Sequence, residues 1–184
     1  MAAQVDKRFG RIDVLINNAA MMAELSQATP FEELDVDEWD RVMAVNVRGT
    51  WLCCRAVMPI MRRQGKGKIV NIASVVAFIG TPWILHYCAS KGAVVAITRS
   101  LAKELAGTGI IVNAIAPGLT ETPALMETLG ERRDEVVDWM VSGQIVQRFE
   151  QPGDLVGACA FLSSDDSDFV AGQTLVVDGG FHTH

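Results

Sequence analysis

The 184-residue sequence has little from which to build a metal centre or a disulfide framework. Its three histidines show no ligand spacing beyond the terminal His182-x-His184, so we expect no metal site. Its four cysteines form no CxxC pair, and Cys53 and Cys54 are adjacent, which is unsuited to a disulfide staple. Buried thiols in a reducing, cytoplasmic compartment are the better interpretation.

The sequence also lacks an excess of positive charge and a long apolar run. A net charge of −6, from 16 basic and 22 acidic side chains, disfavours a nucleic-acid-binding face. No apolar run reaches the roughly 18 residues that span a bilayer, and no secretory signal is visible. We therefore expect neither a nucleic-acid partner nor a membrane role. With roughly 150 residues per domain as a guide, the length predicts one globular domain.

The chain does contain an alternation of short apolar runs and longer helical stretches. Runs rich in branched residues predict strands at 12–17, 68–73, 110–115 and 173–177. Helices are predicted at 2–9, from residue 35, at 50–63, at 87–106 and at 152–162. Strands separated by helices predict a parallel α/β sheet, and their nearly continuous apolar character predicts that both faces are covered.

The helix predicted to start at Asp35 carries one polar residue in an apolar setting. Asp35 is a capping residue, and Val36, Trp39 and Met43 follow at helical spacing, which predicts one buried face. The same face continues to Asn46. A buried amide must find partners, so Asn46 either satisfies backbone groups or organises water.

Tyr87, the only tyrosine in the sequence, lies four residues before Lys91. On a helix this spacing places both side chains on one face. A phenol has a reference pKa of about 10, and a neighbouring ammonium favours the phenolate and lowers that value. Such a pair can exchange a proton with an alcohol or carbonyl oxygen. The alternative is a core tyrosine beside a solvated lysine.

Ser74 ends the second predicted strand, where its hydroxyl is either a turn cap or a donor to a substrate oxygen. In a parallel sheet the carboxyl ends of the strands meet at one edge, where ligands bind. Ser74 and Asn46 are therefore expected near the Tyr87–Lys91 pair.

Six ordered blocks of sequence make the chain resemble the classical short-chain dehydrogenase/reductase family from about Gly10 onward. They are Asn17-Asn-Ala-Ala20, Val45-Asn46-Val-Arg-Gly49, Ile72-Ala-Ser74, Tyr87-Cys-Ala-Ser-Lys91, Val112-Asn-Ala-Ile-Ala-Pro-Gly118 and Val177-Asp-Gly-Gly180. The resemblance implies a Rossmann-like, doubly wound parallel sheet. It also implies reversible hydride transfer between NAD or NADP and an alcohol/carbonyl pair.

The resemblance also implies roles for four catalytic residues. Tyr87 would be the general acid/base, and Lys91 would lower its pKa and bind the nicotinamide ribose. Ser74 would orient the substrate oxygen, and Asn46 would hold a water in a relay to Lys91. The implied cofactor-binding residues, besides Tyr87 and Lys91, are Asn18, Ala19, Ala20, Pro117, Gly118 and Thr122.

The chain departs from the family pattern at two places. Ala20 stands where glycine is usual, which adds one methyl group. The glycine-rich turn that normally presents backbone N–H groups to the pyrophosphate does not occur in the sequence. We therefore expect residues 1–184 to be a single, incomplete domain whose N-terminal strands are missing. The strand at 12–17 would then need a further neighbour.

The resemblance extends to substrate and assembly. Residues 121–148 resemble a substrate lid. Phe78, Ile79, Trp83 and Ile84 are expected near the mouth of the site, and Met21 and Met22 follow the predicted cofactor strand. These residues either line an apolar pocket or only pack the loops. An apolar alcohol or ketone substrate and a homodimer or homotetramer are expected. The alternative is a catalytically silent short form that acts as a subunit or scaffold. Nucleotide-sugar epimerisation is disfavoured, because the chain ends soon after Gly180.

Overall fold

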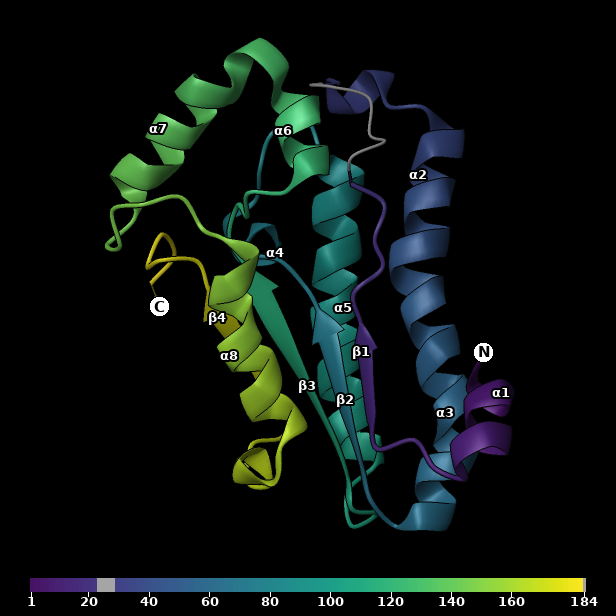
Figure 1. The fold of residues 1–184 in the computed structure, drawn as a ribbon. Coiled ribbons are helices and arrows are strands. Elements are labelled where there is room, and N and C mark those ends of the chain that lie inside the picture. The colour runs from purple at the N-terminus through teal and green to yellow at the C-terminus, as the bar shows by residue number, and fades with distance from the viewer. Residues whose placement is uncertain (23–28, 184) are drawn as a thin grey trace.

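A parallel four-stranded sheet forms the centre of the protein, as predicted. The computed structural model describes residues 1–22 and 29–183. The strands are β1 (Val14–Asn17), β2 (Gly67–Ile72), β3 (Ile110–Pro117) and β4 (Thr174–Val177), and they lie in the order β1-β2-β3-β4 (Figure 1). Every pair is parallel, and in register Leu15 lies beside Ile69 and Ile69 beside Val112.

Helices cover both faces of this sheet, which confirms the doubly wound prediction (Figure 1). One face packs on α3 (Thr50–Gln64) and α5 (Leu85–Glu104), and the other on α8 (Pro152–Ser163). Neighbouring residues of β2 separate the two cores. Ile69 packs with α3 side chains, whereas Val70 packs with Leu162 of α8. The remaining elements are α1 (Ala2–Phe9), α2 (Val36–Val42), η2 (Met43–Gly49), α4 (Val76–Ile79), α6 (Pro123–Leu129), α7 (Arg133–Gly143) and the short η1 (Phe31–Glu33), η3 (Gly130–Arg132) and η4 (Asp165–Ser167).

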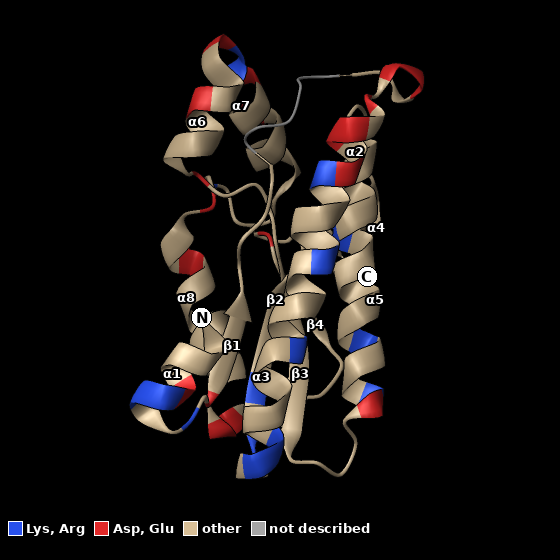
Figure 2. Cartoon of the chain, turned by 90° about the vertical axis from the view of Figure 1, so that its right-hand side faces the viewer, with Lys and Arg blue, Asp and Glu red and all other residues tan. Residues whose placement is uncertain are grey.

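The segments α2, η2 and α3 run on as one long rod (Figure 1). Asp35 caps its start by accepting a hydrogen bond from Asp37 N, as predicted. Figure 2 shows acidic residues at the start of the rod and basic residues at its end, which suits the helix dipole.

The predicted buried face of this rod is wrong for its first turn. Val36 is 71% exposed, and the buried residues are Glu38, Val42 and Asn46. The η2 segment is a π-helix, whose wider turn changes the facing of the residues along the rod. Asn46 is nevertheless buried, as predicted.

The N-terminal region lies at the β1 edge of the sheet. Helix α1 ends at Gly10 in the left-handed region, and Arg63 of α3 holds it through a 2.6 Å ion pair with Asp6. Among the described residues, β1 pairs with β2 alone, and Ile16 of β1 is exposed. The predicted strand 12–17 thus begins two residues later and lies at an edge.

The carboxyl ends of the strands meet at the edge of the sheet below α6 and α7 (Figure 1). This edge collects the loops that follow β1, β2 and β3. Residues 23–28 of the long loop predicted after β1 lie outside the described residues. In the described part of the chain, no helix combines the length and apolar character needed to cross a membrane.

Candidate active site

Helix α5 carries Tyr87, Ser90 and Lys91 on its buried side. Tyr87 is 9% exposed and Lys91 is 3% exposed. The Lys91 ammonium lies 5.5 Å from the centroid of the Tyr87 ring, so the two side chains share a face, as their spacing predicts. The interpretation of Lys91 as a solvated lysine is wrong.

Ser74 follows β2 and meets Tyr87 from the sheet side. Its side chain is close enough to the Tyr87 hydroxyl to lower the pKa of that phenol. The Ser74 hydroxyl also accepts a weak bond of 3.4 Å from Val76 N, so it has the turn role as well. The structure therefore brings together three residues that the sequence separates: Ser74, Tyr87 and Lys91.

Burial governs the proton affinities of this group. It raises the pKa of Tyr87 to about 12, and the nearby Ser74 side chain offsets only part of that rise. Burial also lowers the pKa of Lys91 to about 8. The predicted lowering of the Tyr87 pKa by Lys91 is wrong for this structure. The reason is geometric, because Lys91 Nζ lies over the ring and donates a 2.8 Å hydrogen bond to the Ile72 carbonyl.

Asn46 links the loop after β1 to α5. Its Oδ1 accepts a 2.7 Å hydrogen bond from Met21 N, and its Nδ2 donates to Ser90 Oγ at 3.0 Å. Ser90 Oγ in turn donates to the Tyr87 carbonyl at 2.8 Å. The amide is thus satisfied within the protein and steadies the turn of α5 that carries Tyr87.

The residues expected to border the cofactor lie along the same edge of the sheet. Asn18, Ala19 and Ala20 are exposed and follow β1 directly. Pro117 is buried at the end of β3. Thr122 caps α6, since its hydroxyl accepts a 3.2 Å hydrogen bond from Leu125 N.

Gly118 is fixed by Glu150, a residue that the sequence interpretation missed. Gly118 N donates to the Val177 carbonyl at 2.9 Å and to Glu150 Oε2 at 3.1 Å. The other carboxylate oxygen accepts from the Thr120 hydroxyl. Burial raises the pKa of Glu150. In the sequence Glu150 is only an acidic residue two positions before Pro152. The simpler interpretation of such a residue is a solvated side chain in a loop.

Two asparagines from the six sequence blocks, Asn17 and Asn113, form hydrogen bonds that hold the fold together. Asn17 Nδ2 donates to Asn71 Oδ1 at 2.8 Å, and Asn71 continues to Thr98 of α5 at 2.9 Å. Asn113 binds the segment before β4, through the Val170 carbonyl and Gln173 N. These bonds hold the strands and α5 in place below the site.

Only some of the apolar residues predicted near the site surround Tyr87. Met21, Met22 and Ile84 pack against the cluster of Tyr87 and Val42. Phe78 packs elsewhere and stacks on His182 at 5.8 Å. Phe78 therefore does not belong to the apolar cluster around Tyr87. His184 lies outside the described residues.

Residues 121–148, the predicted lid, contact the C-terminal segment through α7. Trp139 of α7 packs edge-on against Phe181 with 5.3 Å between ring centroids.

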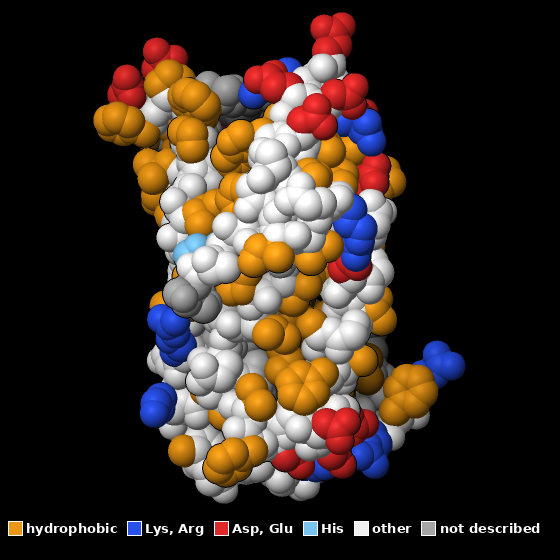
Figure 3. Space-filling model, turned by 90° about the vertical axis from the view of Figure 1, so that its left-hand side faces the viewer, with side chains coloured by type: hydrophobic (Ala, Val, Ile, Leu, Met, Phe, Trp, Pro, Cys, Tyr) orange, Lys and Arg blue, Asp and Glu red, His pale blue; other side chains and the backbone are white. Residues whose placement is uncertain are grey.

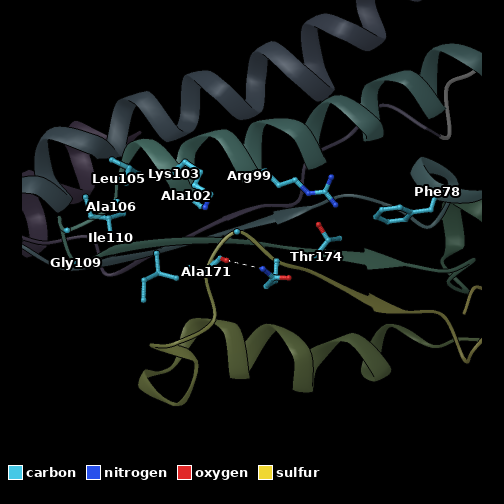
Figure 4. A pocket seen from close by; sticks show the side chains of 14 residues that line it. Phe78, Arg99, Ala102, Lys103, Leu105, Ala106, Gly109, Ile110, Ala171 and Thr174 are labelled. Atoms are coloured by element: carbon cyan, nitrogen blue, oxygen red, sulfur yellow. Dashed lines mark hydrogen bonds between the residues drawn. The ribbon is translucent and has the colours of Figure 1, made fainter. Parts of the chain in front are cut away.

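A groove of about 790 Å³ lies away from Tyr87, beside the second half of α5 (Figure 4). Figure 4 shows Arg99 and Lys103 of α5 on one side of it and Ala171 and Thr174 on the other. Within residues 1–22 and 29–183, no group of three or more His, Cys, Asp or Glu side chains could hold a metal ion.

Comparison with known proteins shows that the chain is similar to oxidoreductases. Residues 1–182 match the family model described as enoyl-(acyl carrier protein) reductase. The chain is 42% identical over 177 residues to 2-(R)-hydroxypropyl-CoM dehydrogenase of Xanthobacter autotrophicus, covering 95% of this chain and 69% of that protein. It is 41% identical to a 3-oxoacyl-(acyl-carrier-protein) reductase of Thermotoga maritima, with 96% and 69% covered.

A solved structure agrees with these relatives. Gluconate 5-dehydrogenase from Burkholderia cenocepacia, in complex with NADP and tartrate, matches 98% of this chain and 68% of its own. The TM-score is 0.88 at 37% identity. The chain therefore belongs to the short-chain dehydrogenase/reductase family of oxidoreductases.

Proposed function

We propose that the chain interconverts an alcohol and a carbonyl compound by NAD(P)-dependent hydride transfer, with Tyr87 as general acid/base. The observation that carries this proposal is the meeting of Ser74, Tyr87 and Lys91 at the carboxyl edge of the sheet. A catalytically silent scaffold is not favoured, because the similar proteins are named as dehydrogenases and reductases.

In the reducing direction, Ser74 donates a hydrogen bond to the carbonyl oxygen and orients it toward Tyr87. The phenol keeps its proton at neutral pH, because burial raises its pKa to about 12. As negative charge develops on the substrate oxygen, Tyr87 transfers its proton to that oxygen. The nicotinamide supplies the hydride when it is bound. In the oxidising direction Tyr87 receives the proton.

The residues present fit the nicotinamide half of the cofactor. The Lys91 ammonium has three N–H donors and donates one to the Ile72 carbonyl, its one hydrogen bond within the described residues, so donors remain for ribose hydroxyls. Asn18, Ala19 and Ala20 offer exposed backbone on one side, and Pro117, Gly118 and Thr122 lie on the other. Asn46, on η2, would hold a water in a relay to Lys91 through the lone pair that its hydrogen bond from Met21 N leaves free. The choice between NAD and NADP stays open.

The proposed substrate is an apolar alcohol or ketone. Met21, Met22 and Ile84 pack around Tyr87, and they supply an apolar lining. Residues 121–148, with α6 and α7, lie over the carboxyl edge of the sheet, where a lid would act (Figure 1).

A homodimer or homotetramer in a reducing, cytoplasmic compartment completes the proposal. Its support is the set of exposed apolar residues on α3, α5 and β4: Trp51, Leu52, Leu85 and Leu175. Figure 3 shows further hydrophobic side chains over one face of the molecule. The four cysteines are free thiols.

Replacement of Tyr87 by phenylalanine tests the mechanism. Tyr87→Phe removes only the hydroxyl, so we expect turnover to fall by about 10²–10⁴-fold while the affinity for NAD(P)H stays at the wild-type value. Steady-state kinetics and a cofactor titration by tryptophan fluorescence measure the two quantities. Near-normal turnover in the variant would mean that another group handles the proton.

A further inference from the structure

A buried hydrogen bond outside the proposed catalytic group joins α2 to α5. His86 directly precedes Tyr87 and is fully buried, and its Nε2 lies 2.9 Å from Oε1 of Glu38. Glu38 is itself only 6% exposed. With Glu38 ionised, its carboxylate only accepts, so Nε2 carries the proton and donates. Two apolar side chains would pack here without the cost of desolvating a carboxylate, so the pair calls for a reason other than stability.

The pair is the first of three contacts between one face of the long rod and the start of α5. Val42 packs against Tyr87, and Asn46 binds Ser90. Along an α-helix, residues four apart drift by about 40° around the axis. The wider π turn of η2 rotates less per residue and brings Asn46 back into line with Glu38 and Val42. The rod therefore lies along the turn that carries Tyr87.

The start of α5 lacks the usual means of fixing its first turn. Its N-cap, Ile84, has no side-chain capping bond. The preceding Trp83 has φ +64°, a strained conformation for a bulky residue. The first N–H groups of a helix have no intrahelical partners, so an uncapped first turn is weakly held. The Glu38–His86 bond anchors this turn from outside.

We infer that Glu38 and His86 are a positioning pair for Tyr87, which holds the first turn of α5 so that the phenol stays against Ser74. The inference rests on the proposed role of Tyr87 in proton transfer. Neither residue of the pair touches the substrate oxygen in this scheme, so both act through Tyr87.

Kinetics of Glu38 variants test the pair. Small errors in placing a reacting group cost about 10²-fold in rate, so Glu38→Ala should lower kcat by that order and leave the KM for NAD(P)H unchanged. Glu38→Gln should recover most of the loss, because its amide oxygen still accepts from His86 Nε2–H. Asp40→Ala removes an exposed carboxylate from the same helix and should have no effect.

A double variant separates positioning from folding stability. Glu38→Leu combined with His86→Phe replaces the pair by apolar side chains and should stay as stable as the wild type. We still expect it to lose kcat as Glu38→Ala does. A stable double variant with the wild-type kcat would overturn the inference.

The single tyrosine gives a readout that does not depend on activity. After a rapid jump to alkaline pH, phenolate absorbance reports Tyr87 alone before the chain unfolds. Burial raises its pKa to about 12, so loosening the turn in Glu38→Ala should lower the midpoint toward 10.0. An unchanged midpoint would overturn the inference. A lowered midpoint together with an active Tyr87→Phe enzyme would support the positioning pair and reject the proposed function.

Discussion

At the scale of single residues, one physical cause moves two pKa values in opposite directions. Burial disfavours the charged form of any group, so it raises the pKa of the Tyr87 phenol and lowers that of the Lys91 ammonium. At neutral pH both groups can therefore be in their proton-bearing forms, with Lys91 close to its titration range. The site holds a proton donor ready at Tyr87.

The shift at Lys91 predicts a pH dependence of stability. Its pKa is about 8 in the folded chain, against 10.5 for an unperturbed lysine. Between these values the unfolded chain binds one more proton at this group, so the contribution of Lys91 to the free energy of unfolding should rise with pH, by about 3 kcal/mol over the window. Burial raises the pKa of Cys54 to about 11 and that of Tyr87 to about 12, so Cys54 opposes this rise above pH 9 and Tyr87 opposes it above pH 10.

Denaturant unfolding at a series of pH values measures this slope. Lys91→Met removes the titrating group and leaves Cys54 and Tyr87 in place, so the difference in free energy of unfolding between the wild type and the variant should shift in favour of the wild type between pH 8 and 10. Parallel curves for the two proteins would show that Lys91 does not titrate as described.

At the scale of elements, the turn between α5 and β3 depends on a close backbone approach. Gly109 has φ +75°, and a Cβ there would collide with the Gly65 carbonyl oxygen of the α3–β2 turn. Gly107, two residues earlier, has φ +76° but open space around the same position. A comparison of substitutions at the two glycines therefore distinguishes the cost of backbone strain from the cost of a steric collision.

Alanine at these two positions tests the difference. Gly107→Ala should cost about 1–2 kcal/mol, the penalty for a side chain in the left-handed region. Gly109→Ala should cost clearly more, because the α3–β2 turn must also move. Thermal or denaturant unfolding of both variants measures the two values. Equal losses would mean that the approach to Gly65 relaxes without cost.

Local sequence signals predicted the elements well where neighbours in sequence decide the structure. Asp35 caps its helix, Gly10 ends α1, and the branched runs form parallel strands. The face of α2 was predicted wrongly because a π-helix follows it, and no local pattern announces a wider turn. Glu150 was missed because its partners, Gly118 and Thr120, are 30 or more residues away.

The direction of the Tyr87 pKa also required the structure. Spacing alone places Lys91 beside Tyr87, but it does not tell whether the ammonium meets the hydroxyl or the ring. Here the Lys91 ammonium donates a hydrogen bond to the Ile72 carbonyl, and burial determines the direction of the Tyr87 pKa shift. Sequence thus predicted which residues meet, and packing determined their proton affinities.

At the scale of the whole molecule, apolar surface remains on several exposed elements. Three of these residues belong to the helices on one face of the sheet: Trp51 and Leu52 of α3 and Leu85 of α5. Leu175 lies on β4, the strand at the edge of the sheet. Because exposed apolar surface is costly in water, its burial between copies of the chain would favour association.

Light scattering measures the resulting assembly. We expect a dimer or tetramer, and Leu52→Glu should shift it toward the monomer, because a charge would be buried in the contact. Phe31→Glu changes an exposed residue on η1 and serves as the control. A wild-type chain that stays monomeric at high concentration would contradict the expectation.

The contact between Trp139 and Phe181 gives the last residues of the chain a mechanical role. Phe181 follows β4, while Trp139 belongs to α7, so a swing of α7 must part the two rings. An aromatic pair contributes about 0.5–1.5 kcal/mol beyond the area it buries. That is close to thermal energy, so this ring contact by itself would restrain α7 only weakly.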